Sequence, residues 1–403
     1  MTDQNPGLPF ARPEELGLSA ARLQRLSAIV AADIERGRIP GAVVLIARAG
    51  RIVHFEALGK QDPASGTAMA KDSIFRIYSM TKPIVSTAIM MLLEEGHFLL
   101  NHPVGDYIPA LAKLEVGTVR RDPATGEKTL DRAPAEKPIT IQDLLRHTAG
   151  LSYGFMGESP VHKLYVEARL DHRGTSNEEM LQKLSQLPLI AEPGTRWEYS
   201  MATDVLGRLV EVISGKSLGS FLQERIFGPL GMVDTGFFVP ETEHPRLAEP
   251  FASDPVTGEK IQLHNVRRQP RLESGGGGLA STALDYARFA QMALDGGTLD
   301  GARLLSRKTV DFMASDHLGD IPGCAEFNGP GVGFGLGYGV RLQPGLTPYQ
   351  GSAGNFYWGG AAGTRFFIDP AERLIAILML QAPGQREHWS TLFPNLVYGC
   401  FDD

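Results

Sequence analysis

A serine and a lysine lie three residues apart at the predicted start of a helix. They are the ends of the run Ser79-Met80-Thr81-Lys82, which follows the apolar stretch 74–78. Residues at this spacing share one face of a helix, so the two side chains lie within hydrogen-bond reach. A serine hydroxyl becomes a good nucleophile when a base takes its proton, and a buried amine at a helix N-terminus can lose its charge. The pair is therefore suited to nucleophilic catalysis; the structural alternative is a helix-capping serine beside a solvated lysine.

Two further segments carry groups that such a serine needs. Tyr199 ends the turn-rich run 192–199 just before a predicted helix, and its phenol can relay the serine proton. The run 358–364 opens a predicted strand, and its small residues let a substrate lie against the backbone. A backbone N–H there, paired with that of Ser79, can hold an oxyanion. The alternatives are a tyrosine packed for structural reasons and an ordinary strand entry.

The helix that positions Ser79 and Lys82 is predicted over 79–96, from apolar residues at helical spacing to a stop at Gly96. Pro83 is tolerable in a first helical turn but disfavours helical geometry at the residue before it. The sequence leaves this conflict open.

The other elements follow from periodicity and turn residues. A one-sided helix is predicted over 18–37, and two strands over 41–47 and 51–58 form a hairpin turned at Ala49-Gly50. Residues 97–245 are mainly helical, with helices at 141–147 and 203–214 and a hairpin over 116–130 turned at 122–126. The rest comprises a helix at 282–295 with Thr282 and Asp285 at capping-box spacing, strands at 333–342, 364–368 and 374–380, and a last helix from about 390.

Strands near both ends with helices between them predict an α/β (α+β) fold. We expect a mixed, largely antiparallel sheet built from 1–96 and 246–403 and flanked by helices, with 97–245 as a mainly helical inserted domain. This organisation suits 403 residues, a length typical of two to three folding units or of one core with an insertion.

Composition excludes several functional classes. The net charge of −7, with 43% hydrophobic and 21% charged residues, is typical of a soluble globular protein, and no long Lys/Arg run indicates nucleic-acid binding. No apolar run reaches the length of a membrane span, and residues 1–13 lack the layout of a secretory leader, so we expect a cytoplasmic protein. The two cysteines, Cys324 and Cys400, are expected to be ordinary thiols.

These motifs resemble the penicillin-binding protein and β-lactamase superfamily, and most closely its class C β-lactamase-like carboxylesterases, called family VIII. The resemblance spans about residues 13–396 and includes 75–82, 139–151, 193–200, 227–232 and 275–290. It implies Ser79 as the acylated nucleophile, Lys82 as its proton partner and Tyr199 as general base. It also implies an oxyanion hole from the N–H groups of Ser79 and Ala361. The substrate-binding segment would comprise Trp358, Gly359, Gly360 and Ala361.

Two departures from the family pattern bear on the substrate. The lactamases usually have Tyr-x-Asn at the second motif, where this chain has Tyr199-Ser200-Met201, and Lys-Thr-Gly at the third, where it has Trp-Gly-Gly. Loss of the amide and of the cation makes the pocket more apolar and removes the partner of a substrate carboxylate. We therefore expect a cofactor-free esterase that acts on short-chain neutral esters. The rivals are a β-lactamase, a D-specific peptidase, an acyltransferase, or a non-catalytic binding protein of the same fold.

One motif competes for the role of nucleophile. Gly150-Leu151-Ser152-Tyr153-Gly154 matches the Gly-x-Ser-x-Gly elbow of α/β-hydrolases, but that elbow needs a strand before the serine and a helix after it. Here a short helix precedes the motif, so we do not expect Ser152 to be catalytic. The glycines at 333–337 lack dinucleotide-binding spacing, and no metal-binding motif occurs, so neither a cofactor nor a metal is expected.

Overall fold

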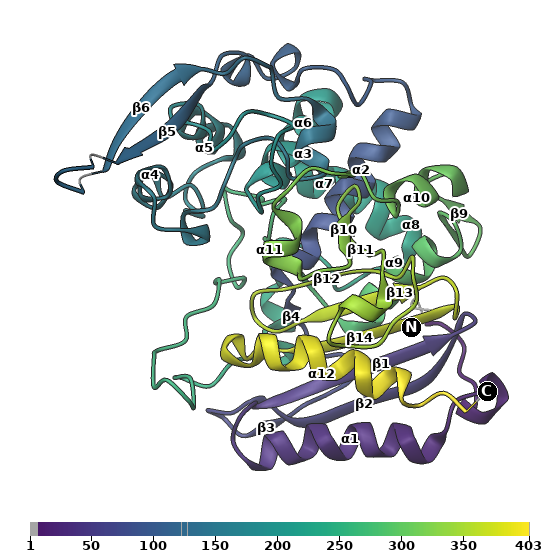
Figure 1. Ribbon diagram of the computed structural model, residues 1–403. Coiled ribbons are helices and arrows are strands. Elements are labelled where there is room, and N and C mark those ends of the chain that lie inside the picture. Colours follow the sequence, from purple (N-terminus) through teal and green to yellow (C-terminus); the bar gives the residue numbers. More distant parts are fainter. Residues whose placement is uncertain (1–6, 122, 127, 403) are drawn as a thin grey trace.

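The computed structural model describes residues 7–121, 123–126 and 128–402. Within these residues, eight strands form one antiparallel sheet in the order β10-β11-β12-β13-β14-β1-β2-β3 (Figure 1). At its centre β1 (Gly41–Arg48) pairs with β14 (Leu374–Leu380), so the two ends of the chain meet in one sheet, as predicted. The other strands are β2 (Arg51–Asp62), β3 (Thr67–Ala68), β10 (Val332–Phe334), β11 (Gly339–Arg341), β12 (Phe356–Gly359) and β13 (Arg365–Asp369).

The hairpin of β1 and β2 turns at the two residues that the sequence predicted. Ala49 and Gly50 have φ of 52° and 76°. Two consecutive left-handed residues match the right-handed twist of the flanking strands, which is the geometry that two-residue hairpin loops favour. This prediction is confirmed.

Helices cover both faces of the sheet. On one face, Val44 and Ile46 of β1 pack with Leu26 of α1 (Ala20–Glu35) and Phe393 of α12 (Arg386–Tyr398), the two helices at the bottom of Figure 1. On the other face, the intervening residues of β1 pack with α9 (Ala283–Leu294), in a hydrophobic core that also includes α2 (Thr81–Glu94). Because successive side chains point to opposite faces and both faces are covered, the central strands are apolar at nearly every position.

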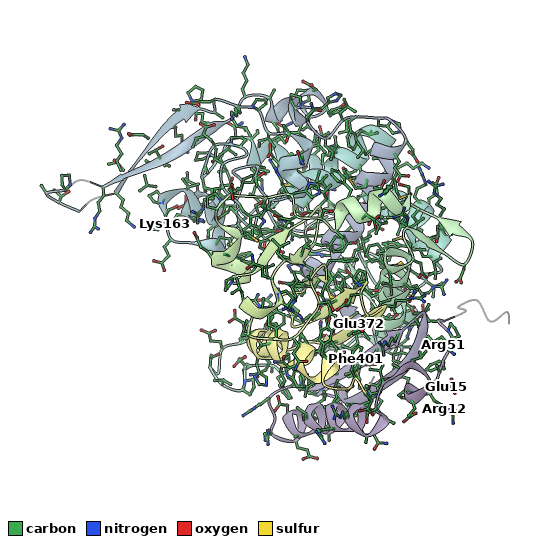
Figure 2. All side chains as sticks on the ribbon, turned by 45° about the vertical axis from the view of Figure 1, so that its right-hand side comes forward. Arg12, Glu15, Arg51, Lys163, Glu372 and Phe401 are labelled. Carbon is green, nitrogen blue, oxygen red and sulfur yellow. The ribbon has the colours of Figure 1, made fainter. Side chains whose placement is uncertain are left out.

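The C-terminal end of the chain is fastened to the sheet. Figure 2 shows Phe401 near Glu372, and the guanidinium of Arg48 connects them: it lies 4.4 Å from the centre of the Phe401 ring and 3.1 Å from the Glu372 carboxylate. These contacts tie the last residues to β1 beside the N-terminal helix.

Most of the regular elements in the middle of the chain are helices. The hairpin of β5 (Glu115–Arg121) and β6 (Lys128–Pro134) projects from it in Figure 1; of its predicted turn, Asp122 lies outside the described residues. The helices here are α3 (Ile141–Leu145), α4 (Pro160–Ala168), α5 (Asn177–Leu184), α6 (Ala202–Ser214), α7 (Leu218–Leu222) and α8 (Gly228–Leu230). The helices predicted at 141–147 and 203–214 are confirmed as α3 and α6, and α6 packs against α2. The proposed division into 1–96 with 246–403 and 97–245 stays a prediction.

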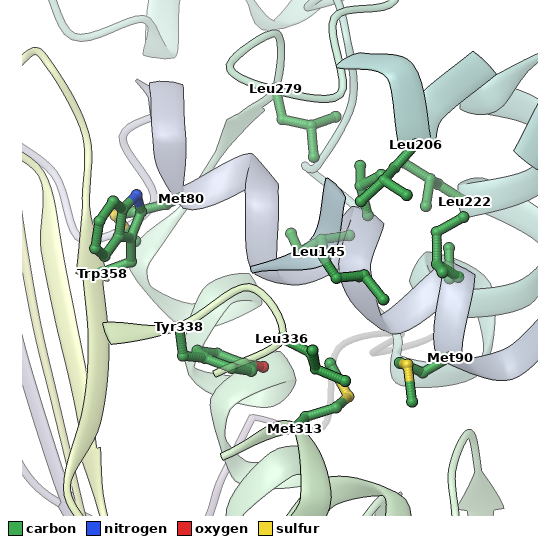
Figure 3. Close-up of a cluster of buried hydrophobic side chains, with 14 of the residues drawn as sticks. Met80, Met90, Leu145, Leu206, Leu222, Leu279, Met313, Leu336, Tyr338 and Trp358 are labelled. Carbon is green, nitrogen blue, oxygen red and sulfur yellow. The ribbon is translucent and has the colours of Figure 1, made fainter. Parts of the chain in front are cut away.

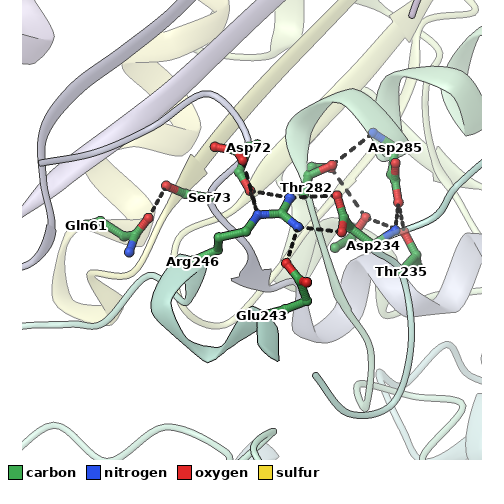
Figure 4. A network of polar contacts seen from close by, with 10 residues as sticks. Gln61, Asp72, Ser73, Asp234, Thr235, Glu243, Arg246, Thr282 and Asp285 are labelled. Carbon is green, nitrogen blue, oxygen red and sulfur yellow. Dashed lines mark hydrogen bonds and ion pairs between the residues drawn. The ribbon is translucent and has the colours of Figure 1, made fainter. Parts of the chain in front are cut away.

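Three local predictions were wrong. The single strand expected at 333–342 is the hairpin of β10 and β11, because the chain reverses at Gly337, whose φ is 102°. The last helix begins at Arg386, four residues early. Thr282 caps α9 by accepting from the Asp285 N–H, but the Asp285 carboxylate does not complete the capping box: it accepts from the N–H of Asp234 and the hydroxyl of Thr235 (Figure 4).

The remaining elements are short. They are α10 (Arg307–Met313), α11 (Cys324–Asn328), β4 (Phe75–Arg76), β7 (Ala280–Ser281), β8 (Thr298–Leu299) and β9 (Ala302–Arg303). Cys324 and Cys400 are free, buried thiols. Among the helices of the described ranges, none combines the length and apolarity needed to cross a bilayer.

Candidate active site

Ser79 lies in a single 3-10 turn, η2 (Tyr78–Met80), between β4 and α2. The residue before it, Tyr78, has a left-handed φ of 44°, which costs a non-glycine residue about 1–3 kcal/mol. Its hydroxyl accepts a 2.9 Å hydrogen bond from the N–H of His264, and its ring packs on the imidazole with 4.7 Å between centroids. These contacts hold the strained residue and thereby fix the turn that presents Ser79.

The conflict between Pro83 and Lys82 resolves in the first turn of α2. The helix begins at Thr81, so Pro83 is its third residue. The first four N–H groups of a helix have no partner within it, so proline loses no hydrogen bond there. Lys82 keeps a helical position in a first turn whose side chains are all buried.

The structure brings Ser79, Lys82 and Tyr199 together. The Tyr199 hydroxyl donates a 2.6 Å hydrogen bond to Ser79 Oγ, and Lys82 Nζ lies 3.4 Å from the same oxygen and 4.6 Å from the centre of the Tyr199 ring. Lys82 is 1% exposed. Hydroxyls can both donate and accept, so a proton can pass along Tyr199, Ser79 and Lys82 without displacement of heavy atoms. The arrangement can activate a serine oxygen.

Aromatic packing fixes the orientation of Tyr199. Its ring stacks on Phe327 at 5.2 Å and packs against Trp358 at 5.4 Å, while Trp358 Nε1 donates a 3.4 Å hydrogen bond to the Tyr199 hydroxyl. His147 lies 5.1 Å away on another side. Such contacts leave the phenol little freedom, so its hydroxyl stays directed at Ser79.

Sequence reasoning missed Tyr153. Its hydroxyl accepts a 3.0 Å hydrogen bond from Lys82 Nζ, and burial, with the nearby charge of Asp204, raises its pKa well above the ordinary value, so it stays protonated. Tyr153 belongs to the elbow-like motif whose serine, Ser152, points elsewhere: the Ser152 hydroxyl is buried and donates to Glu198 at 2.9 Å. The backbone at Tyr153 is extended, and neighbours in extended chain point to opposite sides. This alternation, with Ser152 and Tyr153 on opposite sides of the chain, was the signal that could have revealed Tyr153 as a site residue.

The loop 274–278 supplies another contact that the sequence did not reveal. The carbonyl of Gly276 accepts a 2.6 Å hydrogen bond from Lys82 Nζ. Asp204, in the first turn of α6, accepts hydrogen bonds from the N–H of Gly276 and the hydroxyl of Ser274. From the sequence, these glycines were placed only within the run 275–290 that carries the family resemblance, with no role assigned to them.

The segment 358–361 lies against the turn of Ser79. Figure 3 shows Trp358 of β12 beside Met80 of η2. A Cβ on Gly360 would lie 2.4 Å from the carbonyl oxygen of Ile77, so this close approach requires glycine. Gly360 donates to the Thr364 carbonyl, and the chain then turns with Ala361 exposed.

At the second motif, Met201 stands where the lactamases usually have asparagine, and Ser200 stands at the variable position before it. Ser200 shares a 3.1 Å hydrogen bond with Nδ1 of His147, and Met201 is buried at the N-terminus of α6. Burial, together with the Lys82 charge, lowers the pKa of His147 well below its usual value and keeps the imidazole neutral. Among the described residues, no group of three or more acidic, histidine or cysteine side chains is placed to hold a metal ion.

Comparison with known proteins gives consistent results. The family model described as Beta-lactamase matches residues 26–393. Esterase EstB of Burkholderia gladioli is 32% identical, over 91% of this chain and 92% of its own sequence, and lovastatin esterase of Penicillium rubens is 32% identical, over 87% and 91%. The solved structure of EstCE1, described as a hydrolase with promiscuous acyltransferase activity, superposes with a TM-score of 0.78 at 28% identity, covering 95% of this chain and 99% of that one.

The family match spans most of the chain, and the same fold recurs in the solved structure. It includes the segments that carry Ser79, Lys82, Tyr199 and the run 358–361. The chain therefore belongs to the β-lactamase family, as its motifs indicated, and has esterases among its relatives.

Proposed function

We propose that the protein is a serine carboxylesterase that hydrolyses short-chain neutral esters through an acyl-enzyme on Ser79. The observation that carries this proposal is the 2.6 Å hydrogen bond between the Tyr199 and Ser79 hydroxyls, with buried Lys82 beside both. A serine with two proton-accepting groups in reach is the arrangement that acyl transfer requires.

The reaction divides into two half-reactions. Ser79 Oγ attacks the ester carbonyl carbon while its proton passes to the Lys82–Tyr199 pair, and the carbon–oxygen bond to the alcohol then breaks as the pair returns the proton to the departing oxygen. Water attacks the resulting acyl-serine, the pair takes a proton from the water, and Ser79 regains a proton as the acid leaves.

Backbone N–H groups of Ser79 and Ala361 would hold the negative oxygen that forms in each half-reaction. Supporting this, the Gly360 backbone lies against Ile77, and no described residue accepts a hydrogen bond from the N–H of Ala361. Preorganised donors of this kind contribute about 10²–10³ in rate each.

The surroundings of the site favour a neutral, apolar substrate. The exposed rings of Phe155 and Phe327 stack on Tyr153 and Tyr199, respectively, at 4.9 and 5.2 Å. The segment 358–361 has an indole and three small residues where lactamases carry a cation. We expect the ester to bind between the sheet and the helical part of the chain, against these rings. The names of two relatives, Esterase EstB and lovastatin esterase, support an ester as the substrate class.

The test is hydrolysis of p-nitrophenyl butyrate by the wild-type protein and by Ser79→Ala. The wild type should turn over this ester and be labelled by a fluorophosphonate at Ser79, whereas S79A should do neither. Retained turnover in S79A would move the nucleophile elsewhere. Absence of both labelling and turnover in the wild type would favour a binding protein of the same fold.

Acyl transfer to an alcohol is a second candidate, because EstCE1 is described as having promiscuous acyltransferase activity. The acyl-enzyme is common to both reactions, and the acceptor decides between them. Adding simple alcohols to the butyrate assay and measuring the new ester separates transfer from hydrolysis. A preference for nitrocefin over p-nitrophenyl butyrate would instead identify a β-lactamase.

A further inference from the structure

The hydrogen bond from Lys82 to the Gly276 carbonyl is 2.6 Å long, shorter than its contacts with Tyr153 and Ser79 at 3.0 and 3.4 Å. A carbonyl can only accept, so this contact commits one N–H of the amine and sets the direction of the others. Whatever fixes the Gly276 peptide therefore fixes where the amine lies relative to Ser79 Oγ.

The side chain of Asp204 holds that peptide. Its Oδ1 accepts from the Gly276 N–H at 3.1 Å and from the Ser274 hydroxyl at 2.5 Å. Its Oδ2 fills the space beside the glycine: a Cβ on Gly276 would lie 2.3 Å from that oxygen and 2.8 Å from the Tyr153 hydroxyl. Asp204, Gly276, Tyr153 and Lys82 are thus packed as one polar cluster behind the serine.

Burial of a charged carboxylate at this position costs free energy. Asp204 is fully buried, and burial raises its pKa, whereas the Lys82 charge and the hydrogen bonds from Ser274 and Gly276 oppose the rise. Tyr153 faces the carboxylate from one side and Asp171 interacts with it from another. An apolar side chain would fill such a site without this penalty, so the acid points to a purpose beyond packing.

We infer that Asp204 is a positioning residue for the reaction: through the Gly276 peptide it places the Lys82 amine against Ser79, and it supplies the negative charge that the amine faces from behind. The inference rests on the proposed function. Asp204 would act on the alignment and charge of the proton-accepting pair. Removal of its carboxylate should therefore reduce kcat and change the pH profile, and should leave substrate binding nearly intact.

The chain offers a matched control in Asp285. Both acids are the third residue of a buried helix, and Asp285 also accepts hydrogen bonds from one backbone N–H, of Asp234, and one hydroxyl, of Thr235 (Figure 4). It makes no contact with Lys82 or the loop 274–278 among the described residues. The two asparagine variants therefore remove the same kind of charge, one behind Lys82 and one elsewhere.

The experiment compares wild type, Asp204→Asn and Asp285→Asn in p-nitrophenyl butyrate hydrolysis from pH 5 to 10, with thermal melting in parallel. D204N should lower kcat at least tenfold, with KM within about threefold, and should change the pH profile of kcat/KM, because the carboxylate that holds the Gly276 peptide and faces the Lys82 amine is gone. D285N should keep wild-type kcat and profile. A D204N enzyme with wild-type kcat and profile, or an equal kcat loss in D285N, would overturn the inference.

Two further variants distinguish a failure of the inference about Asp204 from a failure of the proposed function. If D204N does not fold, Ser274→Ala keeps the charge but removes one of the two donors that orient it; a kcat decrease of threefold or more at unchanged KM supports the inference, and unchanged kcat contradicts it. S79A is measured in the same series. Activity in S79A would refute the proposed function itself, whereas an inactive S79A with an unaffected D204N refutes only the role of Asp204.

Discussion

Replacing Tyr199 with phenylalanine isolates the contribution of one hydroxyl. The change deletes the oxygen that lies 2.6 Å from Ser79 Oγ and keeps the ring that stacks on Phe327 and Trp358. Because the packing is retained, the folded protein should lose about 1 kcal/mol, the net value of a typical hydrogen bond. Effects on catalysis and on folding are therefore separable.

The expected loss in kcat is about 10²–10⁴-fold, the range for removal of a positioned general base, which equals about 3–5 kcal/mol of barrier. Lys82 remains 3.4 Å from Ser79 Oγ in the variant and can take the proton less effectively, so activity should fall but persist above that of S79A. KM should change little, since Tyr199 acts in the transition state.

The assay is steady-state hydrolysis of p-nitrophenyl butyrate, with thermal melting to confirm folding. Tyr286→Phe is the control, because its buried hydroxyl donates to the carbonyl of Met80, the neighbour of Ser79, at 2.9 Å. This variant measures how much kcat falls when the turn that carries Ser79 loses a hydrogen bond while every proton acceptor of the site is kept. A folded Y199F with kcat within tenfold of wild type, or a Y286F that loses as much kcat, would refute the role assigned to Tyr199.

Three other changes test separate parts of the account. Ser152→Ala should leave kcat within about twofold and lower stability by about 1–3 kcal/mol, because Glu198 loses a buried partner; a hundredfold kcat loss in folded protein would identify Ser152 as the nucleophile instead. Gly360→Ala should lower kcat about a hundredfold, since its Cβ collides with the Ile77 carbonyl and displaces the next N–H; full activity would contradict that N–H as an oxyanion donor. Burial raises the pKa of Asp285 to about 6 from 3.8, so the folded state binds this proton more tightly than the unfolded chain. This tighter proton binding stabilises the folded state by about 3 kcal/mol. The stabilisation is complete below about pH 4 and is lost as the pH rises through about 6. The free energy of unfolding, measured with urea at pH 4 and pH 7, should change less between these pH values in D285N than in the wild type. The same change in both proteins would disprove the raised pKa of Asp285.

Local sequence signals predicted most of the elements correctly. The hairpin at Ala49-Gly50, the cap at Thr282 and the apolar run of β14 each depend on residues that favour one backbone conformation wherever they occur. Two errors had different causes, a local reversal of the chain and a distant hydrogen-bond partner. The strand expected at 333–342 reverses at Gly337, and the Asp285 carboxylate leaves its own helix for Thr235.

The residues of the candidate site also fall into those that the sequence could reveal and those that it could not. Ser79, Lys82 and Tyr199 could be named from residue type and motif, because their chemistry limits which residues can serve. Tyr153 and Asp204 could not, because a tyrosine beside a buried serine and an acid in a first helical turn both have ordinary structural explanations.

By itself the sequence determined the residue types available for catalysis, the family and the order of helices and strands, all of which depend on short-range preferences and recognisable motifs. Only the tertiary structure decided which hydroxyls and carbonyls surround Lys82, because Tyr153, Tyr199 and Gly276 come from segments far apart in the chain. Their distances depend on how α2, α6 and the loop 274–278 pack, and packing is a property of the whole fold.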